Sequence, residues 1–554
     1  MTQPAATVAC HSYVAIIIFI AIVVCLSPVA TTARFVDAQQ QQTPSAPDEL
    51  VTYEKQSNFI KEFALPFDEL GLRGITTDSQ GNAWFYHSTN MTSTLVSFNP
   101  SNGEFTKFPV EGATVADNPI INLASAQLAF DSKRDAVWFT DARTNSMGKL
   151  DVASGQADLL QIPTDEAGPM GITMSPDGKS VWFTEITGDK IASVDAESMK
   201  ITEYASGEDS GPALISFDDK GILWVTLSFS NSVLRVDTQA LSSSNPSSAM
   251  TELQLSGQDT FSPFGIVVSD GKVYVSDHGS SRVTVSDAGF VNYVSYWTSP
   301  SKAFPTTLPS QVVADRHGNI YFPQHGGNRI SVIDRTGVMT EYEIPTGPLA
   351  TALFIAASGD GKVWFTEWAA NKIAYLDTTG QVPFTVNVEK TAVTLDRNGP
   401  QSIAVSLNSS EATADLVSLS EVEIGLTGMT ESGLRGVTYE AQPPRVNLQD
   451  ARSAESEIQI RADENAKPGS YVTMVRAFAP ENDGLIISRL YPVKVVLDVT
   501  QPAIQTGESG SNSQVSAPFE IRDLGRALAI VAVVGLVGFI VYRRVKRKSA
   551  LAKD

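Results

Sequence analysis

The sequence predicts an all-β protein: a seven-bladed β-propeller followed by a β-sandwich domain, with an N-terminal signal segment and a C-terminal transmembrane helix. The main observation is a short text that occurs seven times, in the form GKVWFTEWAANKIAYLD at residues 361–377. Its copies share an aromatic anchor, which is Trp84, Trp138, Trp182, Trp224, Tyr274, Tyr321 or Trp364. A repeat period in the forties, with short alternating strands and turn residues, is typical of propeller blades. Two further observations are the end of the repeat period at about residue 383 and an apolar run near each end of the chain.

Each repeat predicts four strands. A first strand such as GITMS at 171–175 leads through a glycine-containing turn into the VWFTE strand, and two more alternating strands follow. The third strand commonly ends in Asp, as at Asp195 and Asp377, with Gly often close behind. Because Asp caps its own turn and Gly tolerates positive φ, these Asp residues are expected to be structural.

The ring is expected to close by sharing one blade between the two ends of the propeller. Residues 59–66, FIKEFALP, match the fourth-strand pattern of MTEYEIP at 339–345 but have no three strands before them. The last repeat has three clear strands and no fourth. We therefore expect 59–66 to supply the outer strand of the seventh blade, which would remove two open edges.

The remaining segments predict export and anchoring. Residues 1–38 contain the apolar run YVAIIIFIAIVVCL and small residues suited to signal-peptide cleavage, and 39–57 form a polar linker before the propeller at 58–380. Because no Lys or Arg precedes the apolar run, an uncleaved N-terminal anchor is the alternative. Residues 384–499 show seven or so short strands, which predict an immunoglobulin-like β-sandwich. A linker at 500–524 leads to an apolar helix at 525–542 and a basic tail at 543–554, which place the C-terminus in the cytoplasm and the bulk of the chain outside the cell membrane.

Charge and cysteine content restrict the chemistry. The net charge is −21, and the tail carries +5, so that about −26 remains outside it. A strongly acidic ectodomain argues against nucleic acid as a partner and is compatible with a divalent cation or a cationic ligand. The only cysteines, Cys10 and Cys25, lie in the export segment, which excludes thiol catalysis and disulfides in the exported part.

The repeated text, with GIT, DG-VWFTE, NKI, VD and TEY-IP in this order, resembles the virginiamycin B lyase (streptogramin lyase) family over roughly residues 58 to 380. The resemblance implies a magnesium-dependent elimination that opens a cyclic depsipeptide ester, with histidines in P-H-[AG]-I turns and glutamates in E-x-H and at the WFTE position. Glu185 and Glu367 match the WFTE position. The turn positions before the first strands hold no histidine but Arg73, Ala126, Met170, Ala213, Phe264, Ser310 and Leu353, and no E-x-H occurs.

One set of equivalent positions is a candidate site, three residues beyond each aromatic anchor. It contains the carboxylates Asp141, Glu185, Asp277 and Glu367, which are candidate metal ligands, and the candidate ligand-facing residues His87 and Gln324, with His278 and His325 next to the set. If these positions surround one face of the axial channel, the oxygen ligands would suit Mg²⁺ or Ca²⁺. The alternative is that they are repeat residues near turns with no ligand.

Two functions compete from the sequence, and a purely structural role as a stalk and spacer is a third possibility. The first is a membrane-anchored surface propeller that binds a small-molecule or protein ligand at its axial face. The second is a metal-dependent carbon–oxygen lyase or lactonase that acts on a cyclic ester. The missing histidines favour the first function, and the retained WFTE glutamates keep the second open.

Overall fold

The computed structural model describes residues 53–89, 92–110, 126–241, 246–255, 262–279, 281–299, 306–396, 399–410, 423–429, 436–448 and 452–498. Apart from turns and loops, the secondary structure of these residues is β-strand, and their only helical segments are two short 3₁₀ turns, η1 (Pro246–Ala249) and η3 (Asn482–Gly484). None of the helical segments in this part of the chain is long and apolar enough to cross a membrane. The predicted signal peptide at 1–38, the linker at 500–524, the transmembrane helix at 525–542 and the tail at 543–554 lie outside the described residues.

Seven four-stranded antiparallel units make up the first part of the chain. The first three contain β3 (Leu72–Thr77), β4 (Ala83–Ser88), β5 (Ser93–Asn99) and β6 (Glu104–Pro109); β7 (Leu128–Asp131), β8 (Ala136–Asp141), β9 (Ser146–Asp151) and β10 (Ala157–Gln161); and β11 (Pro169–Met174), β12 (Ser180–Glu185), β13 (Lys190–Asp195) and β14 (Ile201–Ala205). The next two contain β15 (Pro212–Phe217), β16 (Ile222–Leu227), β17 (Ser232–Asp237) and β18 (Met250–Gln254); and β19 (Pro263–Ser269), β20 (Lys272–Asp277), β21 (Arg282–Asp287) and β22 (Tyr293–Trp297). The last two contain β23 (Val313–Ala314), β24 (Ile320–Gln324), β25 (Arg329–Ile333) and β26 (Met339–Glu343); and β28 (Ala352–Ala357), β29 (Lys362–Glu367), β30 (Lys372–Asp377) and β2 (Ile60–Ala64).

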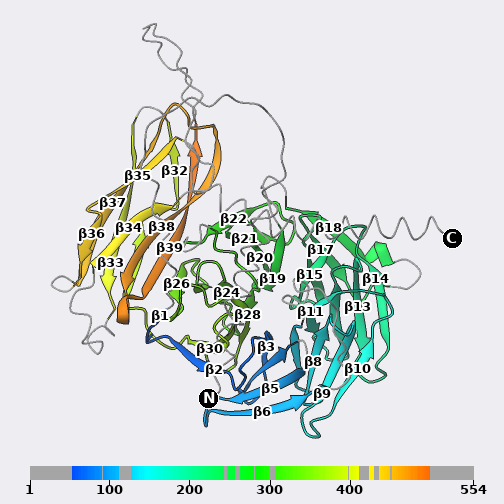
Figure 1. The fold of residues 1–554 in the computed structure, drawn as a ribbon. Coiled ribbons are helices and arrows are strands. Elements are labelled where there is room, and N and C mark those ends of the chain that lie inside the picture. Colours follow the sequence, from blue (N-terminus) through cyan, green and yellow to red (C-terminus); the bar gives the residue numbers. More distant parts are fainter. Residues whose placement is uncertain are drawn as a thin grey trace, which may run out of the picture. The chain divides into compact units, whose positions relative to one another are not determined.

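The units are arranged as the blades of a propeller, numbered here one to seven in this order. Their first strands lie around a common centre (Figure 1), and each contacts the first strand of the next blade. The first strand of blade seven, β28, contacts β3 of blade one, so the ring is closed. This confirms the all-β propeller that the repeat period predicts.

The seventh blade is completed from the N-terminal side, as the FIKEFALP pattern predicts. Strand β2 pairs antiparallel with β30, and Phe63 lies opposite Ile373. Phe63 also contacts Phe98 of blade one and Trp364 of its own blade, with ring centroids 4.6 Å and 5.9 Å apart. The outer strand therefore stabilises both the closing sheet and its contact with the first blade.

Strand alternation explains how the blades pack on one another. In β12, Trp182 belongs to an apolar cluster with the side chains of blade four, whereas Val181 and Phe183 pack with Trp138 of blade two. Successive residues of a strand point to opposite faces of the sheet, so one strand contributes to two interfaces. The anchoring aromatics are all buried, which explains their recurrence.

A hydroxyl two residues beyond the anchor joins neighbouring blades. The Thr184 hydroxyl accepts a hydrogen bond from the backbone N–H of Gly171 (2.8 Å) and donates to the carbonyl of Ala213 in the next blade (2.6 Å). The equivalent donors in blades two, four and five are Thr140, Thr226 and Ser276, whose acceptors are the carbonyls of Met170, Phe264 and Ser310. The T of the WFTE text is therefore an interblade hydrogen-bonding residue.

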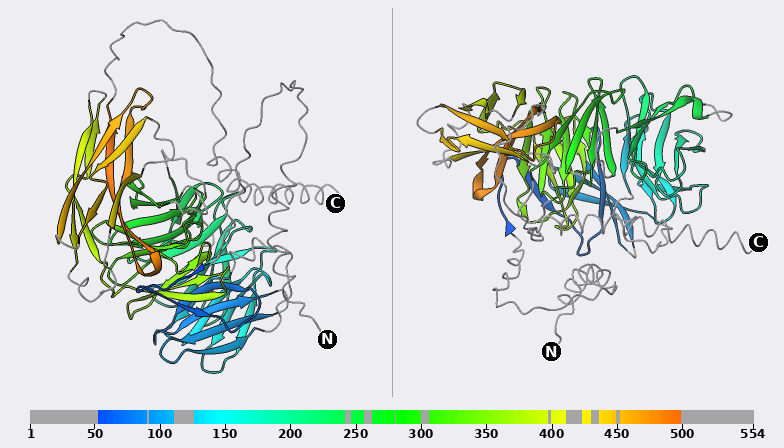
Figure 2. Two further views of the ribbon diagram at one scale, coloured as in Figure 1. Left: turned by 60° about the vertical axis from the view of Figure 1, so that its left-hand side comes forward. Right: turned by 90° about the horizontal axis from the view of Figure 1, so that it is seen from above.

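The residues after the propeller form two sheets. One contains β31 (Phe384–Val388), β33 (Gln401–Ser409), β37 (Ser453–Ala462) and β35 (Val437–Gln442). The other contains β39 (Ile486–Leu497), β38 (Gly469–Pro480), β34 (Glu423–Met429) and β36 (Arg445–Asn447), with β32 (Ala392–Leu395) parallel to β39. Figure 2 shows these strands stacked in two layers, and apolar residues of both sheets, such as Val405 and Val493, share one buried cluster. The domain is thus a β-sandwich, and its immunoglobulin-like assignment stays a prediction.

Blade six continues into this sandwich through backbone pairing. Its outer strand β26 pairs antiparallel with β39, with Thr340 opposite Arg489, which gives one nine-stranded sheet. Beside this junction, β1 (Tyr53–Glu54) pairs with β27 (Thr346–Gly347). The Ser57 hydroxyl donates to Glu481, 2.8 Å away, so the segment before the closing strand is tied to the sandwich as well.

Candidate functional site

The position three residues beyond each aromatic anchor lies at the end of the second strand and is buried inside the blade. Glu185 has the same strand parity as Phe183, so it faces blade two and not the axis of the ring. Its environment includes Lys190 on the third strand, Glu203 on the fourth strand and Thr164 on the loop before the blade. Lys190 forms a 2.7 Å ion pair with Glu203, whose carboxylate also accepts a hydrogen bond from the Thr164 hydroxyl (2.9 Å).

The same side-chain unit occurs in blade seven. Glu367 lies near Lys372 and Glu62, and Lys372 pairs with Glu62 at 2.9 Å. The hydroxyl of Thr346 donates to Glu62 at 2.8 Å, as Thr164 does to Glu203. In blade six the position holds Gln324, whose amide nitrogen donates to Glu341 (2.8 Å) and to the hydroxyl of Ser331 (2.6 Å).

Burial changes the ionisation of the two glutamates. The carboxylate oxygens of Glu185 and Glu367 are buried, and no well-formed hydrogen bond reaches them from the described residues, although Glu203 and Glu62 lie close. Burial, reinforced by the nearby charge of Glu203, raises the pKa of Glu185 to about 7. Burial and the charge of Glu62 hold the pKa of Glu367 well above its ordinary value. The two WFTE glutamates are therefore poor anionic ligands near neutral pH.

The two aspartates have cationic or donor partners of their own. Asp141 accepts hydrogen bonds from the Tyr86 hydroxyl (2.8 Å) and from the backbone N–H of Arg143 (2.9 Å). Asp277 forms a buried 3.1 Å ion pair with Arg282. Each carboxylate is thus engaged within the structure of its own blade or the neighbouring one.

The expected convergence of Asp141, Glu185, Asp277 and Glu367 on one cation does not occur. The described residues contain no group of three or more His, Cys, Asp or Glu side chains arranged to hold a metal ion. The physical reason is the strand alternation, which turns these side chains toward interfaces between blades. The residues present at these positions do not fit the magnesium ion that the family resemblance implies, and we derive no chemical step through a metal.

The four other candidate residues separate into two groups. His87 is buried, stacks on Phe67 with ring centroids 3.8 Å apart, and shares a hydrogen bond of 3.0 Å with the carbonyl of Glu69. Gln324 is buried and bonded within blade six, as described above. His278 and His325 are only half-buried, and they lie against each other.

The histidine pair joins blades five and six. The Nε2 atoms of His278 and His325 are 3.2 Å apart, and the ring planes differ by 9°. Nδ1 of His278 lies 3.0 Å from the carbonyl of Pro309, and its ring also contacts Phe264. Burial lowers the pKa of both imidazoles, and the proximity of His278 lowers that of His325 further, so both are neutral near pH 7.

Hydrogen bonding determines which nitrogens of this pair carry protons. A carbonyl only accepts, so Nδ1 of His278 must be the N–H donor to Pro309. Nε2 of the neutral His278 is then the acceptor, and Nε2 of His325 must donate to it. The remaining lone pair belongs to Nδ1 of His325, which is the hydrogen-bond acceptor that the pair leaves open.

Apolar side chains lie next to the histidine pair, at the same end of the first strands of the blades. Met170, Ala213 and Leu214 form a buried cluster, with Ile186 and Phe264 packed against it. Phe264 contacts the cluster and also His278. We call His278, His325, Phe264 and Pro309 the histidine face. Both histidines are among the candidates named from the sequence, four residues beyond their anchors and one position after the candidate set, but their contact with each other was not predicted.

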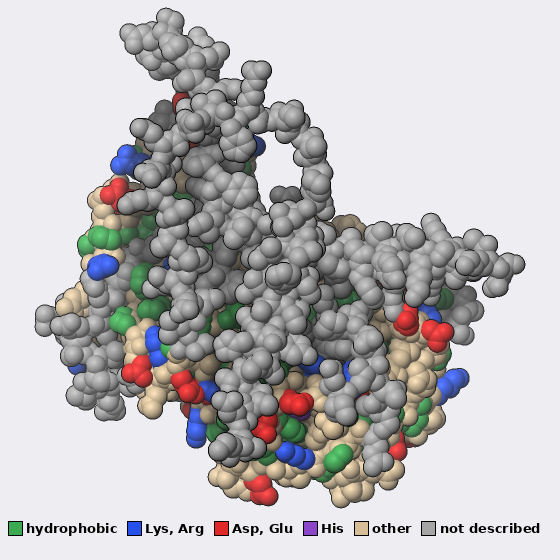
Figure 3. All heavy atoms as spheres, in the orientation of Figure 1, with side chains coloured by type: hydrophobic (Ala, Val, Ile, Leu, Met, Phe, Trp, Pro, Cys, Tyr) green, Lys and Arg blue, Asp and Glu red, His purple; other side chains and the backbone are tan. Residues whose placement is uncertain are grey.

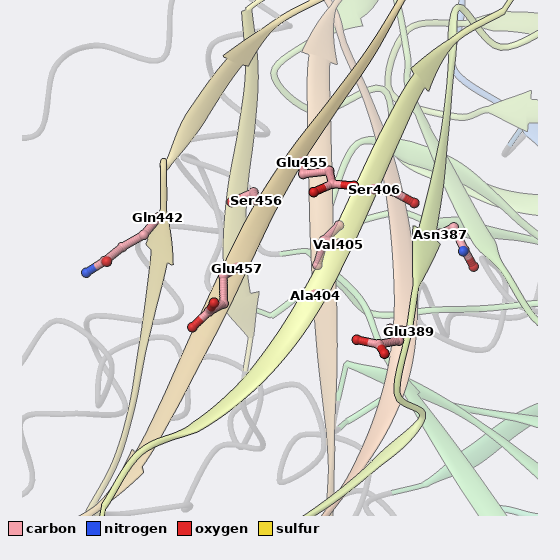
Figure 4. Close-up of a pocket in the computed structure, with 9 residues that line it drawn as sticks. All are labelled: Asn387, Glu389, Ala404, Val405, Ser406, Gln442, Glu455, Ser456 and Glu457. Atoms are coloured by element: carbon pink, nitrogen blue, oxygen red, sulfur yellow. The ribbon is translucent and has the colours of Figure 1, made fainter.

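Two cavities lie elsewhere. One of about 320 Å³ lies at the other end of the strands of blades six and seven and includes Asp315, His317 and Asp360. The other, of about 500 Å³, lies on the sandwich, where Figure 4 shows Glu389, Glu455 and Glu457 around it. On the visible face of the described residues, acidic and basic side chains are scattered and form no single patch (Figure 3). Neither cavity includes a residue of the histidine face.

The fold and the histidine pair define a β-propeller protein with a paired-imidazole site at one end of its first strands. The model of the virginiamycin B lyase family matches residues 58–247 and 248–438, and the chain belongs to this family. A solved streptogramin B lyase is 26% identical, with 57% of this chain and 97% of that chain covered and a TM-score of 0.48. Virginiamycin B lyase from Staphylococcus aureus is 22% identical, with 57% and 98% covered and a TM-score of 0.48, and a catalytically inactive variant of it has been solved with quinupristin. The comparison with curated proteins gave no match.

Proposed function

We propose that the protein binds a small-molecule ligand at the histidine face, on a propeller displayed outside the cell and anchored by residues 525–542. The observation that supports binding is the neutral pair of His278 and His325, which leaves Nδ1 of His325 as an open hydrogen-bond acceptor on a partly buried side chain. The adjoining Phe264 and its apolar neighbours would contact the apolar part of a ligand. Export and anchoring are supported by the apolar runs at both ends of the sequence.

A second candidate function is the opening of a cyclic ester by elimination. Family membership and the neutral state of His325 favour it. Nδ1 of His325 would take a proton from the carbon next to the one that bears the ester oxygen. The electrons of that C–H bond would form the C=C bond while the C–O bond breaks and the carboxylate leaves. His278 would hold the imidazole of His325 in the required tautomer.

The experiment uses the full-length chain in a non-ionic detergent with quinupristin, the compound bound in the S. aureus family structure, as the probe. Calorimetric titration measures binding, and mass spectrometry of the compound detects the linear product. The variants are His325→Gln and His278→Gln, with His317→Gln as the matched control, because His317 lies in an exposed turn at the other end of blade six.

The outcomes separate the two functions. Binding that is lost in both site variants and kept in the control, without a linear product, supports a binding protein. A linear product that requires His325 supports the lyase. Binding that both site variants retain, or no binding and no product with the unchanged chain, overturns the proposed ligand site for this class of compound.

A further inference from the structure

Two arginines from neighbouring blades, Arg73 and Arg143, donate hydrogen bonds to the same residue, Ser88. Arg73 lies on β3 of blade one, and its guanidinium donates to the carbonyl of Ser88 (3.3 Å). Arg143 follows β8 of blade two, and its guanidinium donates to the hydroxyls of Ser88 and Ser93, the latter at 3.0 Å. The shared partner keeps the two positive charges close, and the nearby charge of Arg143 adds to burial in lowering the pKa of Arg73 to about 10.

Both guanidiniums keep an unused donor. Nη1 of Arg73 and Nη2 of Arg143 are buried and have no hydrogen-bond partner in the described part of the chain. Arg143 is only 7% exposed, so its guanidinium is largely shielded from bulk solvent. A buried guanidinium N–H without an acceptor is costly, and such groups in native proteins normally have a partner.

The nearest acid does not complete the site. The Oδ2 atom of Asp141 accepts from the Tyr86 hydroxyl, and its Oδ1 atom accepts from the backbone N–H of Arg143. No ion pair joins Asp141 to either guanidinium among the described residues. Two positive charges with one negative charge leave a net charge of +1 at this place. The amide nitrogen of Gln127 is a third buried donor, and its residue adjoins Gly74, next to Arg73.

We infer that Arg73 and Arg143 form a binding site for an anionic group, a carboxylate or a phosphate, between blades one and two. Planar guanidiniums with free N–H groups match the oxygens of such anions. Arg73 holds in blade one the strand position that Phe264 holds in blade five, so the anion site and the histidine face lie at the same end of the first strands. The inference does not depend on the proposed function of the histidine pair.

Thermal unfolding of the full-length chain in a non-ionic detergent tests the inference. The midpoint is measured with increasing phosphate, acetate or succinate against chloride at constant ionic strength. We expect a saturable rise of roughly 2 to 4 °C with at least one of these anions, and the anion that produces it distinguishes a phosphate from a carboxylate ligand.

Variants distinguish this site from general salt effects. Arg143→Met and Arg73→Met should lose the anion-dependent rise, and Arg143→Lys should keep part of it. Arg335→Met is the matched control, because Arg335 is exposed and pairs with Asp270 away from the site. His325→Gln should keep the whole rise, which separates this site from the histidine face. A midpoint that does not respond to any of the three anions, or a rise that both methionine variants retain, would overturn the inference.

Discussion

Replacing Glu185 by Gln should stabilise the protein, and the gain should depend on pH. Burial raises the pKa of this carboxyl from 4.5 to about 7 in the folded state. One pKa unit corresponds to about 1.4 kcal/mol, so ionising Glu185 in the folded protein costs about 3 kcal/mol relative to the unfolded chain. Blade six already has glutamine at the equivalent position. The amide of Gln324 donates a hydrogen bond to Glu341, which corresponds to Glu203 beside Glu185.

The sign of the effect follows from proton binding. Below about pH 4.5 the carboxyl is protonated in both states, so Glu185→Gln should change the free energy of unfolding little. Between about pH 4.5 and 7 the folded state retains the proton that the unfolded state loses, so the stability of the unchanged protein falls as pH rises. Above about pH 7 the full cost is present, and the variant should be more stable by up to about 3 kcal/mol.

Urea unfolding of the full-length chain, followed by tryptophan fluorescence between about pH 4 and 8, measures this difference. The matched control is Glu197→Gln in the same blade, since the side chain of Glu197 is 87% exposed. The control should show no pH-dependent gain. If Glu185→Gln destabilises the protein at about pH 8, or if its effect does not vary with pH, then the carboxylate is used in its charged form and the proposed burial cost is wrong.

Four further predictions concern the fold, the anchor and the metal. Thr184→Val removes two buried hydrogen bonds between backbone and hydroxyl and should cost about 1 to 3 kcal/mol in urea unfolding, whereas Thr251→Val on the exposed face of β18 should cost little. Phe63→Ala should cost about 2 kcal/mol and increase self-association in gel filtration, because it weakens the strand that covers the edge of β30. Asp277→Asn should cost about 3 to 5 kcal/mol because it removes the negative charge from a buried ion pair with Arg282, with the same cost in millimolar Mg²⁺ and in EDTA; a cost that appears only with Mg²⁺ would indicate a metal ligand instead. Removal of residues 525–554 should release the chain from the membrane fraction, and a truncated chain that still sediments with membranes would contradict the anchor.

The repeated sequence predicts the propeller well because its recurring residues have the same structural role in each blade. The aromatic anchor fills the interface with the next blade, and the hydroxyl of residues such as Thr184 bonds to that blade. The closing strand at Ile60–Ala64 was also predictable, since its pattern matches the other fourth strands and its three partners are missing beside it. These features depend on sequence spacing alone.

The site was less predictable from the sequence. The repeat determines where a residue lies along its strand, but it does not determine which side chains contact that residue. The position of Glu185 was expected to face the axis, and strand parity turns it toward blade two instead. The units formed by Glu185 with Lys190 and Glu203 depend on the register of three strands. The contact between His278 and His325 joins two blades, and the pairing of Arg73 and Arg143 depends on their common bonds to Ser88. The spacing of residues in the sequence does not predict these contacts between side chains of different blades.

The backbone pairing of β26 with β39 has a mechanical consequence. The ladder joins residues 339–342 of blade six to residues 487–490 of the sandwich, and β39 continues to Leu497. Any pull on the chain beyond Leu497 is therefore applied along a strand that is hydrogen-bonded to blade six, and it loads several bonds in shear at once. The junction cannot act as a swivel.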